Sequence, residues 1–289
     1  GNGIALDTIR GSTKALRTST NGAETTNTFA TFDSEGFNIT GTFNESNETT
    51  VAWNWKAGGT AVSNTNGSIT SQVSANPAAG FSIVSWTHGS GSQSIGHGLS
   101  QKPDMIIVKG RSNVSSWWTW HKGLSSETQS FIHVDTTSAA GANVNAWNNQ
   151  APTASVFYQK EYILSNNDTG IAYAFHSVDG YSRVGSYVGN GSTDGVYVHC
   201  GFSPAFIITK SIAGTGWRMI DNKRTPYNPS TASLYPDSSD AEYTGSGHET
   251  DFTSNGFKMR NSNSRLNTSG QTYIFLAFAE TPFKHSTAR

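Results

Sequence analysis

The sequence predicts an all-β fold made of tandem antiparallel β-sandwich (jelly-roll-like) repeats of about 100 residues. Three observations support this class. Ser, Thr, Asn and 30 Gly dominate the composition while charged residues make up 13%, a mixture that disfavours helix interiors and suits strands joined by turns. Short β-branched or aromatic segments alternate with Gly, Asn and Ser clusters. Several blocks also recur in the same order along the chain, which indicates repeated structural units.

The first recurring block carries a pair of opposite charges. When Asp7 is aligned with Asp221, Arg10 falls on Arg224, and the middle copy places His121 at the Asp position. A recurring ion pair or hydrogen bond that pins a turn is the interpretation we favour for both Asp–Arg pairs. Because the middle unit replaces the acid with His, this position is a poor candidate for catalysis.

The second recurring block is a hairpin followed by a strand. Phe32–Ile39 matches Phe252–Met259, and each contains a Gly-centred turn. The strand expected next is Thr49–Trp55 in the first copy, Gly170–Phe175 in the second and Thr272–Phe278 in the third.

The front half of the repeat occurs only twice, as Pro103–Lys109 and Pro204–Lys210. The first unit therefore begins mid-repeat, and we expect an earlier stretch of chain in the full gene product. The predicted organisation is a truncated first repeat at 1–57, a linker or exposed hairpin at 58–80, a second repeat at 81–180 and a third repeat at 181–289.

Strands and one short helix are expected within these units. Apolar runs at Met105–Val108 and Phe206–Thr209 suit central strands buried on both faces. Other strands are predicted at Phe81–Thr87, Ser155–Phe157, Val196–His199 and Tyr273–Phe278. Ala5–Leu16 is the one segment with a pattern that supports a short helix.

Charge and cysteine content exclude several classes of protein. The net charge is −1 with no basic face, so no nucleic-acid partner is expected. No apolar stretch is long enough for a membrane helix, so no membrane insertion is expected. Cys200 is the only cysteine, which excludes an intrachain disulfide and predicts a small core or edge residue. The scattered His residues predict no metal site, and nothing indicates a cofactor.

The aromatic stretch Trp117, Trp118, Trp120 and His121 is the one candidate for ligand binding. Exposed Trp faces stack on sugar rings, so these residues would form a glycan platform. Alternatively the rings fill the sandwich core or a contact between units, which the recurrence of Trp117 as Trp217 favours. Neither a Gly-x-Ser-x-Gly motif nor a recurring carboxylate pair occurs, so the sequence predicts no enzyme.

Eight segments of the chain together form a pattern that is shared with a known family. They are Asp7–Gly11, Val51–Gly59, Gly67–Ser71, Gly80–Val84, Ile95–Leu99, Lys102–Lys109, Gly185–Ser192 and Ala279–Lys284. On these segments the chain resembles the C-terminal repeat region of tail-fibre or tail-associated virion proteins of marine tailed bacteriophages. In that family a concanavalin-like, laminin-G-type lectin domain usually precedes this region.

The resemblance implies a non-enzymatic structural protein of the virion, an extracellular particle, placed in a tail fibre or surface appendage with a role in host attachment. The partners it implies are other virion proteins, copies of the chain in a homotrimer, and a host surface glycan. Three units that satisfy their edges within one chain are the alternative to a trimer. A lectin-like carbohydrate-binding module is the second functional hypothesis, and a polysaccharide depolymerase is the third.

Overall fold

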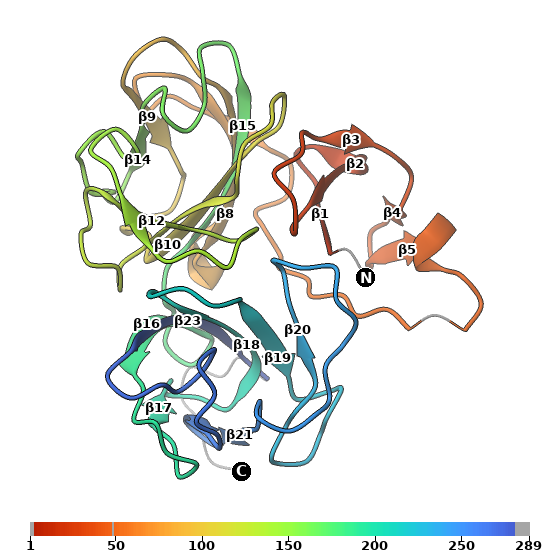
Figure 1. The fold of residues 1–289 in the computed structure, drawn as a ribbon. Coiled ribbons are helices and arrows are strands. Elements are labelled where there is room, and N and C mark those ends of the chain that lie inside the picture. The colour runs from red at the N-terminus through yellow and green to blue at the C-terminus, as the bar shows by residue number, and fades with distance from the viewer. Residues whose placement is uncertain (1–2, 48, 281–289) are drawn as a thin grey trace.

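The computed structural model describes residues 3–47 and 49–280, and within them the chain is all-β, with 40% strand and 2% helix (Figure 1). Every pair of named strands is antiparallel, as the sequence predicts. Residues 1–2, 48 and 281–289 of the predicted first and third repeats lie outside the described residues, as does the end of the Ala279–Lys284 segment.

Units one, two and three are the names used below for the three repeats, with the hairpin of residues 62–76 counted in unit two. Unit two is a sandwich of a large and a small sheet. The large sheet has the order β13-β12-β11-β10-β15-β8-β7-β6, and β14 pairs with β9 in the small one. The strands are β6 (Val62–Asn64), β7 (Ser71–Asn76), β8 (Phe81–Thr87), β9 (Gln93–Gly96), β10 (Met105–Gly110), β11 (Trp118–His121), β12 (Ser130–His133), β13 (Gly141–Ala142), β14 (Val156–Gln159) and β15 (Thr169–Phe175). Alternate strand residues face the small sheet or the opposite side, as the pleat requires.

Unit three repeats this topology. Its sheets have the orders β16-β23-β18-β19-β20 and β17-β22-β21. The strands are β16 (Ser182–Val188), β17 (Tyr197–His199), β18 (Pro204–Ser211), β19 (Arg218–Asp221), β20 (Ser233–Leu234), β21 (Thr250–Thr253), β22 (Gly256–Met259) and β23 (Thr272–Ala279). Strands β16, β23, β18, β19 and β20 stand in the order of β8, β15, β10, β11 and β12, so the two units share one sheet plan.

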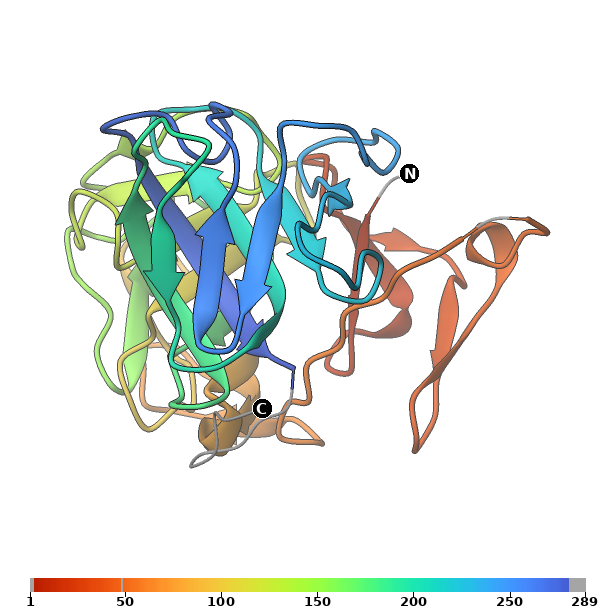
Figure 2. The ribbon, with the colours of Figure 1, turned by 90° about the horizontal axis from the view of Figure 1, so that it is seen from below.

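Unit one contains only part of that plan. The strands β1 (Ile4–Asp7), β2 (Gly11–Arg17) and β3 (Thr25–Thr26) form a small sheet, while β4 (Ala30–Phe32) and β5 (Phe37–Ile39) form a separate hairpin. Figure 2 shows this hairpin standing away from the body of the molecule. By the alignment of Asp7 with Asp221, β1 corresponds to β19.

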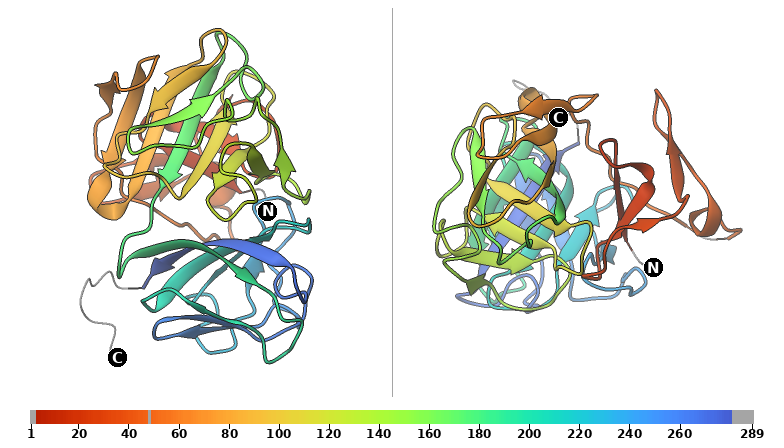
Figure 3. Two further views of the ribbon diagram at one scale, coloured as in Figure 1. Left: turned by 90° about the vertical axis from the view of Figure 1, so that its left-hand side faces the viewer. Right: turned by 90° about the horizontal axis from the view of Figure 1, so that it is seen from above.

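Two apolar clusters fill the sandwiches and a third joins the units. One lies between the sheets of unit two and another between the sheets of unit three. The central cluster lies where the large sheets of units two and three face each other (Figure 3) and also takes in Leu16 of unit one. Its buried members are Leu16, Phe81, Ile83, Met105, Trp117, Leu124, Ile132, Val134, Ile171, Phe175, Val184, Phe206, Ile208, Trp217, Ile274, Leu276 and Phe278. The large sheets are therefore buried on both faces.

Three equivalent aromatic residues meet in the central cluster. Trp55, Phe175 and Phe278 occupy the same position of the three copies. Their ring centroids lie 6.4 Å apart for Trp55–Phe175, 5.5 Å for Trp55–Phe278 and 6.2 Å for Phe175–Phe278. Such separations are typical of favourable ring pairs. The aromatic residue at this position of each unit thus contacts the equivalent residues of the other two units. The three units therefore surround a common centre.

Most predicted strands are confirmed, and three expectations are wrong. Residues 5–16 form β1, a turn and part of β2 rather than a helix, because β2 pairs with β1 across the turn at Asp7–Gly11. Thr49–Trp55 has no strand pairing. Residues 58–80 are not a free linker, because β7 pairs with β8 and extends the large sheet, so the hairpin alternative holds. Cys200 is buried in the core of unit three, the first of the two predicted alternatives.

Candidate functional site

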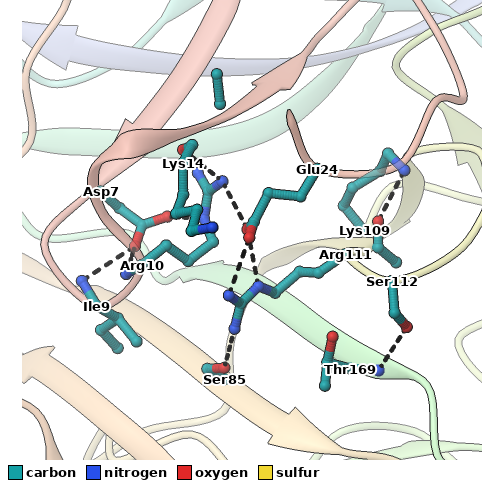
Figure 4. Close-up of polar contacts among 12 residues, drawn as sticks. Asp7, Ile9, Arg10, Lys14, Glu24, Ser85, Lys109, Arg111, Ser112 and Thr169 are labelled. Carbon is teal, nitrogen blue, oxygen red and sulfur yellow. Dashed lines mark hydrogen bonds and ion pairs between the residues drawn. The ribbon is translucent and has the colours of Figure 1, made fainter. Parts of the chain in front are cut away.

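The predicted pair Asp7–Arg10 lies at the junction of units one and two (Figure 4). Arg10 Nε lies 2.6 Å from Asp7 Oδ2, and both side chains are almost fully buried. Asp7 Oδ1 accepts hydrogen bonds from the backbone N–H groups of Ile9 and Arg10. Tyr173 of β15 donates to Asp7 Oδ2 at 2.7 Å and accepts from Arg10 Nη2 at 3.1 Å. The turn after β1 is thereby tied to unit two.

A second acid extends this ion cluster. Arg111 donates to both Glu24 carboxylate oxygens, at 2.9 and 3.2 Å, and Arg10 Nη1 lies 3.3 Å from Glu24 Oε2. Arg111 also donates to Ser85 of β8 at 3.2 Å. Burial alone would raise the pKa of Glu24, but the hydrogen bonds and charge of Arg111 outweigh it and hold that pKa low. Glu24 is therefore held ionised between two guanidinium groups.

The recurring pair Asp221–Arg224 forms the corresponding contact of unit three with unit one. Arg224 Nε lies 2.7 Å from Asp221 Oδ2, and Arg224 also bonds to Glu242. The Arg224 guanidinium lies 5.6 Å from the ring centroid of Trp53, a cation–π arrangement. Trp53 aligns with Tyr173. Both Asp–Arg pairs therefore pin a turn, as predicted, and both contact the last segment of another unit.

His121 completes the set at the junction of units two and three. Its Nε2 lies 3.3 Å from the backbone oxygen of Phe275 in β23, and its Nδ1 accepts from the backbone N–H of Gly123 at 2.9 Å. In the same way Asp7 accepts from the backbone N–H of Ile9, and Asp221 accepts from that of Lys223. Burial lowers the pKa of His121 to about 4, so a neutral imidazole acts as both donor and acceptor.

Trp117 and Trp217 are equivalent residues that bridge successive units. Trp117 Nε1 donates to the backbone oxygen of Arg17 at 2.9 Å, and Trp217 Nε1 donates to that of His133 at 2.7 Å. Arg17 pairs with Ile4 while His133 pairs with Trp118, so the two acceptors are also equivalent. Each of these contacts joins one unit to the preceding one in the chain.

The predicted glycan platform is wrong for three of its four residues. Trp117, Trp120 and His121 are 3% exposed or less, so their faces are unavailable to a sugar. Trp120 fills the sandwich interior and donates its indole N–H to Glu127. Trp118 is half-buried and packs its ring among Phe131, His133 and Tyr162. The core-packing alternative is the one that the structure supports.

Two buried lysines form a recurring pair that the sequence analysis did not single out. Lys109 and Lys210 hold the same position of β10 and β18 and are fully buried. Lys109 Nζ donates to the backbone oxygen of Gly110 at 2.8 Å, and Lys210 Nζ donates to that of Thr215. Burial lowers the pKa of each amine to about 8. The available signal was a Lys closing the same apolar run in both copies.

Two surface hollows are the concave features of interest. One, of about 500 Å³, lies at the junction of units two and three and is lined mainly by polar atoms. Another, of about 400 Å³, lies in the loops of unit three, with Tyr235, Tyr243, His248 and Arg265 in its lining. Within the described residues no three His, Cys, Asp or Glu side chains gather as a metal site would require. The described part also has no helix long and apolar enough to cross a membrane.

These features define a class of protein: a β-repeat protein in which three related units join through equivalent residues around one apolar centre. Residues 2–282 match a domain family of unknown function, DUF7483. The chain belongs to that family. No curated protein and no solved structure matches it.

Proposed function

We propose that this protein is a non-enzymatic structural component of a bacteriophage virion, placed in a tail fibre or surface appendage. One observation carries the structural part of the proposal. The residues that recur between copies, and that looked most suited to chemistry, are buried at unit junctions, where they hold units together. The resemblance to tail-associated virion proteins supplies the setting. Buried ion pairs and shared aromatic packing suit a rigid extracellular part.

Host attachment is the role we propose for the exposed surface of this appendage. The aromatic stretch at Trp117–His121 is buried and gives no support to glycan binding there. The hollow of about 400 Å³ in unit three is the observation that favours carbohydrate binding as a second candidate function. Tyr243 is 39% exposed at this hollow, and Arg265 stacks on Tyr235 at 4.9 Å. Aromatic rings beside polar side chains are the kind of surface that holds a sugar ring.

The virion proposal is tested on purified particles. Peptide mass spectrometry and immunogold labelling with antibodies against this chain should find it in intact virions and place the label on the tail. Absence from purified particles would refute the proposal. Release of oligosaccharides from host polysaccharide by the isolated protein would instead support the depolymerase hypothesis.

The carbohydrate-binding candidate is tested on a glycan array with two matched variants. Tyr243→Ala should weaken binding, because it removes the exposed ring of the hollow. Tyr227→Ala is the control, since Tyr227 is 83% exposed and does not line the hollow. Equal binding by wild type and both variants, or no binding by any, would remove this candidate.

A further inference from the structure

Unit one has no counterpart, among its described residues, of the three shared strands that come just before β11 in unit two and just before β19 in unit three. In unit two those strands are β8, β9 and β10, and in unit three they are β16, β17 and β18. The last strand of each complete unit lies between two of them: β15 pairs with β8 and β10, and β23 pairs with β16 and β18. The equivalent segment of unit one is Val51–Trp55.

Val51–Trp55 is packed against the protein on one face only. Val51, Trp53 and Trp55 are half-buried, while Ala52 and Asn54 are exposed, which is the period-two alternation of an extended chain. Trp53 and Trp55 pack against the central cluster. No backbone hydrogen bond joins these five residues to another residue of the described ranges. The segment is thus extended and anchored on one face, but unpaired.

The outward face of this segment differs from that of its equivalents. Ala172 and Ala174 of β15 are the counterparts of Ala52 and Asn54, and both are fully buried within the sandwich of unit two. These two positions are therefore buried in a unit whose flanking strands are present.

The hairpin of unit one shows the same incompleteness. In unit three β22 pairs with both β21 and β17, and its Phe257 is fully buried. In unit one β5 pairs with β4 alone within the described residues, and the equivalent Phe37 is 36% exposed. A two-stranded hairpin without a packed face is marginally stable at best. The open edge of β5 is where a strand equivalent to β17 would pair.

We propose that unit one is a strand-acceptor site that binds a polypeptide segment supplying three β-strands. Two strands would flank Val51–Trp55, and the third would pair with β5 and cover Phe37. The partner is a segment with the apolar pattern of β16–β18. In both complete units these strands lead directly into β11 or β19, the equivalents of β1, so the donor enters on the N-terminal side of Ile4. Backbone pairing supplies its affinity and the two exposed faces supply its specificity.

The chain itself provides a donor with which to test this. Residues 181–216, which carry β16, β17 and β18, are copied directly in front of Gly3 of the full chain. The matched control has the same fusion with Ile207→Asp and Ile208→Asp in the copied segment only, since these neighbours face the two opposite sides of β18. Amide hydrogen exchange is then followed by mass spectrometry over residues 30–39 and 49–57.

The fused donor should slow exchange over residues 49–57 on the order of 100-fold relative to the control, because unpaired amides become those of a buried central strand. Residues 30–39 should gain protection as well. Exchange equal to that of the control would overturn the proposal. Protection produced by the same donor as a separate polypeptide, but not by the fusion, would overturn the N-terminal entry. Retained protection of β15 and β23 in every sample shows that the rest of the chain is folded.

Discussion

Replacing Asp7 with Ala should destabilise the junction of units one and two more than any single exposed substitution in this chain. The carboxylate accepts from the backbone N–H groups of Ile9 and Arg10, from Arg10 Nε and from the Tyr173 hydroxyl. All four hydrogen bonds would be lost. The Arg10 side chain, which is fully buried, would keep as its one ion pair the weaker contact with Glu24 at 3.3 Å.

The loss of stability in Asp7→Ala depends on the contacts that the Arg10 side chain keeps. Removal of one partner of a buried ion pair typically costs about 3–5 kcal/mol, because the other charge stays in a poorly solvated site. Glu24 and two backbone oxygens still accept from Arg10, so we expect the lower part of that range, about 3 kcal/mol. For an exposed pair such as Lys102–Glu127, 40% and 50% exposed at 2.7 Å, the cost is at most about 1 kcal/mol.

Urea unfolding of Asp7→Ala, with Glu127→Ala as the matched control, measures this difference. The midpoint should fall for Asp7→Ala, with little change for the control, and the slope should stay the same if folding remains cooperative. A double variant, Asp7→Ala with Arg10→Leu, should recover part of the loss, because no uncompensated charge remains. The reasoning would be refuted if Asp7→Ala and Glu127→Ala unfolded at the same midpoint, or if the double variant were less stable than the single.

Three further perturbations test other features. Burial lowers the pKa of His121 from 6.5 to about 4, so between those pH values His121 binds more protons in the unfolded chain than in the folded one. The contribution of His121 to stability should therefore fall by up to about 3 kcal/mol as pH falls through that window. His121→Gln should flatten this part of a thermal-unfolding pH profile, and an unchanged profile would contradict the assignment. Trp217→Phe leaves the His133 carbonyl unpaired and should cost about 1–3 kcal/mol by urea titration, whereas Trp118→Phe should cost less. Gly80 has φ 64°, and an added Cβ would clash with the backbone oxygen of His176. Gly80→Ala should therefore lower the melting temperature more than Gly91→Ala, because Gly91 has φ 75° but open space around it. Equal shifts would show that conformational strain alone decides the cost.

Much of the fold could be predicted because the repeat provides several observations of each element. The apolar runs at Met105–Val108 and Phe206–Thr209 lie in central strands, since only strands buried on both faces need continuous apolar residues. The error at Thr49–Trp55 has a physical origin. The β-pattern was real, but a strand needs partners, and pairing is a property of the surrounding sheet rather than of the segment.

The candidate site was less predictable than the fold. Recurrence of Asp7–Arg10 as Asp221–Arg224 correctly indicated architecture, but no pattern in the sequence showed that Tyr173 and Trp53 face these pairs from other units. The sequence alone also does not show which tryptophan rings are exposed and which are buried. The position of Trp120 inside the sandwich follows only from strand register, because a shift of one residue would have turned its ring to the opposite face.

The meeting of Trp55, Phe175 and Phe278 has a consequence for the order in which the protein can be made. These rings come from the unpaired segment Val51–Trp55, from β15 and from β23 of a chain that leaves the ribosome N-terminus first. Trp55 and Phe175 are synthesised well before β23, which carries Phe278 and pairs with β16 and β18. The common centre therefore stays open to water until β23 emerges from the ribosome. Until then the nascent chain exposes apolar surface and free strand edges, features that favour aggregation, so translation speed and chaperone access before β23 emerges should govern the yield of folded protein.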